Sequence, residues 1–142
     1  MRREAIPMHD DDQAAFTDAD RLAVHELVAR YANAIDARDW DRLETVFADA
    51  ARFTMEGFGG GRREYVGWPA IREMMEHARH PVTHHVTNVE VVRADGGVAE
   101  VHSKIAGVGG QGRVGSADYD DLVVWEGEMW RIAERTVSLR AR

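Results

Sequence analysis

The chain has 142 residues, of which 44% are hydrophobic and 30% are charged, with a formal net charge of −7 at pH 7. This length and composition are typical of one globular domain. The absence of cysteine excludes disulfides, zinc–thiolate sites and thiol catalysis. The acidic balance argues against a nucleic-acid partner, because phosphate binding needs a positive surface. No apolar run approaches the roughly 18 residues of a membrane helix, and the sequence shows no secretion leader. We therefore expect a cytoplasmic protein without a membrane partner.

The N-terminal segment and the first helix are distinguished by their patterns. Residues 1–16 carry mixed charges and an Asp triplet without any period, which predicts a mobile tail before a single domain over residues 17–142. Thr17 followed by Asp20 is typical of a capped helix start. One stripe at helical period then predicts a helix over residues 18–36, and its apolar members are Val24, Leu27, Val28, Tyr31, Ala34 and Ile35.

Two further helices and a short strand are predicted before residue 80. A helix over about 39–48 has Asp39 as its N-cap and an apolar face of Trp40, Leu43, Val46 and Phe47. A strand near 51–56 leads into the glycine run GFGGGRR. This run lacks the GK[ST] ending of a phosphate-binding loop. A third helix follows Gly67-Trp68-Pro69 and continues to about residue 78.

The remainder alternates apolar and polar residues at period two, which predicts strands over 83–93, 98–107, 114–126 and 129–139. Turn residues separate the first pair and the last pair of these strands. Helices followed by an antiparallel meander indicate an α+β fold. We expect a cone-shaped α+β barrel in which three N-terminal helices pack on a strongly curved, mostly antiparallel sheet. Such a cone suits a small-molecule substrate.

The candidates for chemistry are Asp36 and the three histidines on predicted strands, His84, His85 and His102. His77 and His80, at the end of the third helix, are interpreted as surface residues. A carboxylate at a helix C-terminus is electrostatically unfavourable, so Asp36 needs a partner. An imidazole would serve, and the carboxylate would make that ring a general base. The alternative interpretation leaves His84 and His102 solvated on the outer side of the sheet.

Strand alternation places His84 and His85 on opposite faces. His85 shares its face with Val89 and Val91, whereas His84 shares its face with Asn88. Alternation by itself therefore favours His85 as the residue that faces the interior.

The segment from Tyr31 to Asp49 (YANAIDARDWDRLETVFAD), the stretch THHVTN at 83–88 and the closing strand with its Trp resemble SnoaL-like proteins of the nuclear transport factor 2-like superfamily. Scytalone dehydratase, bile acid 7α-dehydratase and hexachlorocyclohexane dehydrochlorinase are the similar members. The resemblance implies an Asp36–His84 pair as the acid–base centre, and it favours His84 over His85. A β-bulge, or a polar stripe that faces the pocket, would reconcile this choice with the alternation.

The same resemblance implies Tyr31 and His102 as further catalytic residues. The strand Tyr of scytalone dehydratase falls near Met55 here, and its Tyr before the Asp is Ile35, so the type of machinery is implied and the substrate is not. The residues that could line the substrate pocket, or serve as plain core, are Phe53, Met55, Phe58, Trp68, Met75, Asn88 and His85.

Three functions compete. The leading hypothesis is a cofactor-independent, dehydratase-like lyase or isomerase acting on a small hydrophobic, possibly polycyclic, carbonyl compound. The second is a non-catalytic module of the same fold that binds small molecules or assembles with partners. The third is a metal enzyme using His84, His102 and a carboxylate, although none of the predicted helices carries an H-x-x-x-H spacing, and we assign no metal. We also expect a homo-oligomer, dimer or trimer, formed through an outer apolar patch of Val89, Val91, Val123 and Trp125.

Overall fold

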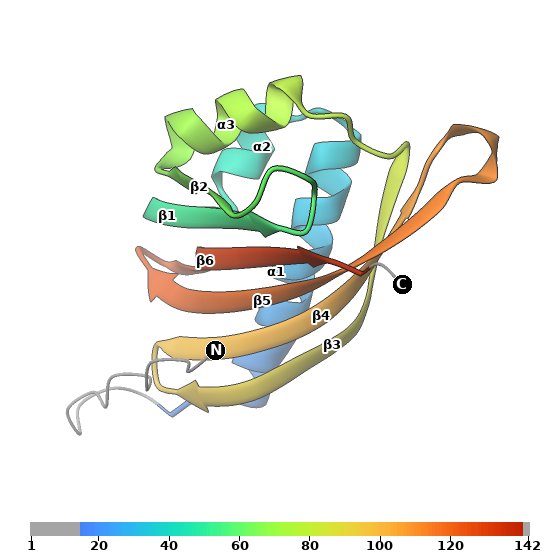
Figure 1. Ribbon diagram of the computed structural model, residues 1–142. Helices are drawn as coiled ribbons and strands as arrows, with labels where there is room; N and C mark the ends of the chain where they lie inside the picture. The colour runs from blue at the N-terminus through green and yellow to red at the C-terminus, as the bar shows by residue number, and fades with distance from the viewer. Residues whose placement is uncertain (1–14, 141–142) are drawn as a thin grey trace.

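The computed structural model describes residues 15–140, so most of the predicted tail lies outside the described residues. Three helices, α1 (Asp18–Asp36), α2 (Trp40–Glu44) and α3 (Trp68–His77), pack against a curved sheet (Figure 1). Its strands are β1 (Phe47–Glu56), β2 (Arg63–Val66), β3 (Thr83–Asp95), β4 (Val98–Val108), β5 (Val114–Glu126) and β6 (Met129–Leu139). None of the helices described is long and apolar enough to cross a membrane.

The six strands form one open sheet in the order β2-β1-β6-β5-β4-β3. Strands β1 and β6 pair in parallel, and every other neighbouring pair is antiparallel. The predicted α+β fold with a mostly antiparallel sheet is therefore confirmed, but β2 and β3 stay as free edges instead of closing the cone into a barrel. The β4–β5 connection, with a short 3-10 turn at Gly110–Gly112, projects beyond the rest of the sheet (Figure 1).

Helix α1 has the predicted bounds and the predicted cap. Thr17 accepts a hydrogen bond from the Asp20 backbone at 3.1 Å, while the Asp20 carboxylate accepts one from the Thr17 backbone at 2.8 Å. This reciprocal pair satisfies two amide groups that a helix start leaves free. The predicted apolar stripe is buried against the sheet, so α1 forms one wall of the interior.

Helix α2 is shorter than predicted. It ends at Glu44 because Thr45 caps it, its hydroxyl donating to the Arg42 carbonyl at 2.6 Å. Val46 and Phe47, which were assigned to the helix, leave it and run toward β6, where the Ile132 amide donates to the Val46 carbonyl at 2.8 Å. The missed strand β2 has only four residues, which is too short to show a period.

Strand β3 contains a bulge in the middle of the THHVTNVEV stretch. Thr87 pairs with Lys104 and Glu90 pairs with His102. Between these pairs β3 advances by three residues and β4 by two, so β3 carries one extra residue. Asn88 takes the strained position, with φ of +53°. Asparagine tolerates this left-handed region better than most residues.

The bulge changes the parity of the strand. His84 before the bulge and Val89 and Val91 after it face the same interior, whereas His85 points outward and is exposed. Of the two ways to reconcile the family resemblance with the alternation, the structure therefore has the bulge, and the simple alternation that favoured His85 was wrong.

The predicted outer apolar patch is also wrong. Val123 is fully buried, and Val89 and Val91 pack against the core. Only Trp125 is exposed, and its ring leans on Trp130 with centroids 5.9 Å apart. Oligomerisation stays a prediction, but these four residues do not form the interface that we expected.

The bulge yields a stability prediction. Asn88→Val should lower the free energy of unfolding by about 1–2 kcal/mol, because a β-branched side chain is strained at positive φ. Asn88→Gly should cost less, since glycine adopts this conformation freely. Urea denaturation of the three proteins measures both changes, and equal stability of the Val and Gly variants would contradict the assignment of strain.

Candidate active site

Asp36 and His84 meet where the last turn of α1 crosses the start of β3. Nδ1 of His84 lies 2.6 Å from Oδ1 of Asp36, and the backbone amide of His84 donates to both carboxylate oxygens at 3.1 and 3.0 Å. The His84 side chain is 9% exposed and that of Asp36 is 20% exposed. These hydrogen bonds stabilise the carboxylate against the unfavourable end of the helix dipole.

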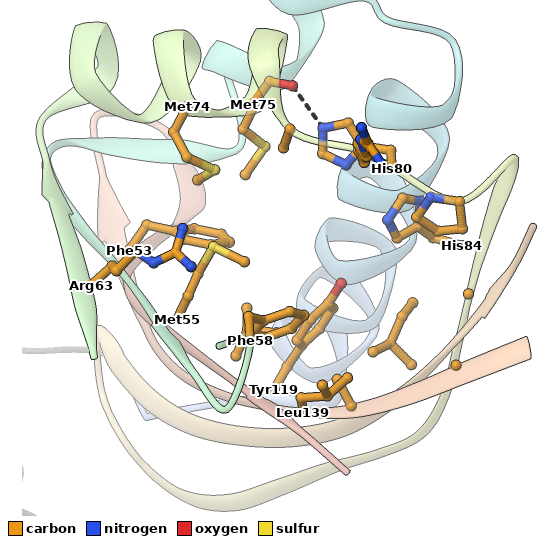
Figure 2. A pocket seen from close by; sticks show the side chains of 18 of the residues that line it. Phe53, Met55, Phe58, Arg63, Met74, Met75, His80, His84, Tyr119 and Leu139 are labelled. Carbon is orange, nitrogen blue, oxygen red and sulfur yellow. Dashed lines mark hydrogen bonds between the residues drawn. The ribbon is translucent and has the colours of Figure 1, made fainter. Parts of the chain in front are cut away.

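The contact decides which ring nitrogen of His84 is free. An ionised carboxylate only accepts hydrogen bonds, so Nδ1 carries the proton. Nε2 then keeps its lone pair, and it has no hydrogen-bond partner within residues 15–140. The ring points into the cavity (Figure 2). This is the arrangement of a general base oriented by a carboxylate.

A second imidazole, that of His80, lies beside the first (Figure 2). The ring centroids of His80 and His84 are 5.8 Å apart, and Nε2 of His80 donates to the Met75 carbonyl at 2.7 Å. Burial lowers the pKa of the His80 ring below its ordinary value, so the ring is held neutral with a lone pair on Nδ1. The interpretation of His80 as a surface residue was wrong, because the chain turns inward after α3.

Pro81 explains that turn. It packs over Gly107 of β4, the residue that pairs with His84. A Cβ on Gly107 would lie 2.8 Å from Pro81 Cγ, closer than packing allows. The glycine therefore lets the segment before β3 lie against the sheet, which brings His80 next to His84.

The cavity has a volume of about 1040 Å³, just above the roughly 300–1,000 Å³ that is usual for small-molecule sites. Four of the expected pocket residues line it, namely Phe53, Met55, Phe58 and Met75 (Figure 2). The others do not. Trp68 stacks on Phe47 with centroids 5.8 Å apart, Asn88 occupies the exposed bulge, and His85 is on the outer face next to Thr83.

Two tyrosines line the cavity. Tyr31 of α1 lines it as expected, and Tyr119 of β5, which sequence reasoning missed, points its hydroxyl into it (Figure 2). Burial raises the pKa of both tyrosines, so both remain protonated donors. Their rings meet edge to face with centroids 5.8 Å apart.

A buried cation supports these tyrosines from behind. The guanidinium carbon of Arg135 lies 4.2 Å from the centroid of the Tyr31 ring and 4.0 Å from that of Tyr119. Arg135 is fully buried, and it donates to both oxygens of Asp121 at 2.8 and 2.7 Å. The charge of Asp121 and the hydrogen bonds to it raise the pKa of Arg135, although burial works against the charged form. The guanidinium therefore stays charged and fixes both rings.

His102 does not reach this site. It lies on the opposite face of the sheet, where its Nδ1 is 2.9 Å from Oδ1 of Asp120. The expected constellation of His102 with His84 is therefore not formed, either for acid–base chemistry or for a metal triad. Within residues 15–140, no group of three or more His, Asp or Glu side chains could hold a metal ion.

Comparisons with known proteins identify the family and the fold. A sequence profile of the SnoaL-like domain matches residues 18–136. No curated protein sequence matches significantly. A candidate aromatic ring hydroxylase from Novosphingobium aromaticivorans is similar in structure, with a TM-score of 0.73, 28% identity and coverage of 89% of this chain and 92% of that one.

Two more distant structures share the fold. One is a candidate scytalone dehydratase from Novosphingobium aromaticivorans, with a TM-score of 0.72 and 17% identity over 87% of this chain and 85% of that one. The other is a hexachlorocyclohexane dehydrochlorinase from Novosphingobium barchaimii, with a TM-score of 0.70 and 18% identity over 87% and 88%.

The buried ion pair yields one prediction. Arg135→Met should lower the free energy of unfolding by about 3–5 kcal/mol, because it leaves Asp121 buried without its partner. Arg52→Met removes the exposed pair with Glu64 and should cost no more than about 1 kcal/mol. Urea denaturation compares the two variants, and equal losses would contradict the role given to burial.

His80 yields a pH dependence. Its pKa is lowered in the folded protein from an ordinary value of 6.5, so below that pH the unfolded chain binds a proton that the folded protein does not. The free energy of unfolding should therefore fall as the pH drops from 7 toward 5, and by less in His80→Gln. Urea denaturation at both pH values measures this, and an identical loss in the variant would exclude His80 as its source.

Proposed function

Because the chain belongs to the SnoaL-like family, we propose that it is a cofactor-independent lyase or isomerase for a small, apolar carbonyl compound. The observation that carries the proposal is the 2.6 Å contact of Asp36 with His84 at the wall of a largely apolar cavity. The Asp36 contact holds Nδ1 of the ring, so Nε2 is the nitrogen that a substrate in the cavity can reach.

The chemistry begins at Nε2 of His84. It takes a proton from the carbon next to the substrate carbonyl, and Asp36 stabilises the imidazolium that forms. The electron pair of the broken C–H bond moves onto the carbonyl oxygen as an enolate. The imidazolium can then give its proton to a hydroxyl on the next carbon, which leaves as water while the enolate electrons form the new C=C bond. Where the enolate is conjugated with a further C=C bond, the imidazolium can instead return the proton to the far carbon of that bond. The first outcome is a lyase reaction and the second is an isomerisation.

The carbonyl oxygen of the substrate becomes negatively charged in the enolate, so it needs hydrogen-bond donors. Tyr119 points its hydroxyl into the cavity, Tyr31 lines the same wall, and Arg135 behind their rings keeps both in place. Donors that are already oriented stabilise developing charge without reorganisation. His102 has no part in this proposal, because it lies across the sheet.

Two structures that share the fold support a lyase reaction, because one is a candidate scytalone dehydratase and the other is a hexachlorocyclohexane dehydrochlorinase. The alternative function is a binding module without catalysis. The size of the cavity supports a binding module as well as an enzyme. The unprotonated Nε2 of His84, which faces the cavity, favours the enzyme.

The test is exchange of the carbon-bound protons of β-tetralone, an apolar bicyclic ketone, with deuterated water. His84→Asn and Asp36→Asn should each slow the exchange by about 10²–10⁴-fold, the second because an amide can hold the ring in the wrong tautomer. NMR follows the loss of the proton signals.

Matched controls are His85→Asn, on the outer face of the same strand, and His102→Asn, and both should exchange at the native rate. If the native protein binds β-tetralone and does not accelerate exchange, the binding module is the correct function. Native rates in both dyad variants would exclude His84 as the base.

A further inference from the structure

The glycine run before β2 folds around one arginine. Residues 57–62 connect β1 to β2, and four glycines here have positive φ. The carbonyl of Gly59 accepts a hydrogen bond from Nη2 of Arg63 at 2.6 Å. A Cβ on Gly60, at φ of +116°, would lie 3.1 Å from the same nitrogen. The loop therefore leaves room for the guanidinium and fixes one of its donors.

Arg63 faces the cavity, whereas neighbouring arginines face carboxylates. Arg52 pairs with Glu64 at 3.2 Å, and Arg62 pairs with Glu56 at 2.8 Å. No carboxylate in residues 15–140 pairs with Arg63, which lines the cavity across from His84 with apolar side chains between them (Figure 2). A guanidinium has five N–H donors, so most of those on Arg63 remain for a ligand.

The fixed charges around the cavity are opposite to the balance of the chain. The protein has a net charge of −7. The cavity is nevertheless lined by three arginines, Arg63, Arg79 and Arg113, and by one carboxylate, Glu73. A local positive excess attracts anions into the site.

We propose that Arg63 binds the carboxylate of an apolar keto acid whose carbonyl end reaches His84. The planar fork of arginine matches a carboxylate with two parallel hydrogen bonds. The apolar residues between the two ends hold the hydrocarbon body, including Phe58 at the tip of the glycine loop. This inference rests on the proposed function only for the His84 end of the ligand.

The test compares two probes by isothermal titration calorimetry. One is acetylnaphthalene and the other is acetylnaphthoate, which carries a carboxylate on the ring opposite the acetyl group. The native protein should bind acetylnaphthoate about tenfold more tightly. In Arg63→Gln this preference should vanish while the affinity for acetylnaphthalene is unchanged. Arg63→Lys should keep part of the preference for acetylnaphthoate, because the positive charge remains while the paired N–H donors of the guanidinium are lost.

Arg62→Gln is the matched control and should keep the full preference, because Arg62 pairs outside the cavity. His84→Asn should also keep it, so a failure of the proton-transfer chemistry would leave this result standing. Equal binding of the two probes by the native protein, no binding of either probe, or an unchanged preference in Arg63→Gln would each overturn the proposal.

Discussion

One carboxylate connects the helical layer to the sheet at the point where the chemistry is expected. Asp36 ends α1 and accepts hydrogen bonds from both the ring and the backbone amide of His84. Because two of these bonds go to the main chain, they place the first residues of β3 as well as the ring. The orientation of the base is therefore a property of how helix and strand pack. A loose side-chain contact could not hold the ring to the accuracy that proton transfer needs.

Sequence patterns predicted the features that depend on residues close together in the chain, such as the helix cap and the alternation of the strands. The capping pair at Thr17 and Asp20 marked the start of α1, and period-two alternation located the last four strands with small errors in their ends. The contact between Asp36 and His84 could be predicted because an anion at a helix end requires a partner and the family resemblance named one. Which face of β3 is inside could not be read from alternation, since a single bulge at Asn88 reverses it.

The other wrong predictions concern residues whose burial depends on partners far away in the sequence. Asp121 interrupts the apolar face of β5, and only its pairing with Arg135 from β6 makes it an interior position. This hid Tyr119, two residues before it. His102 was placed in the site by the family resemblance alone, because it alternates with the buried residues Val101 and Ile105 and so lies on the outer face of β4. His80 was placed outside because nothing local shows that Pro81 rests on Gly107 of another strand.

The open edge of the sheet gives the Asp36 carboxylate a second consequence. β3 is an edge strand, and the unpaired amides of such strands recruit strands from other chains. Asp36 occupies the amide of His84, and its negative charge repels an incoming carbonyl oxygen. The carboxylate that orients the His84 ring thus also caps this end of the edge strand against intermolecular strand addition, so losing it would remove a safeguard against aggregation together with the orientation of the ring.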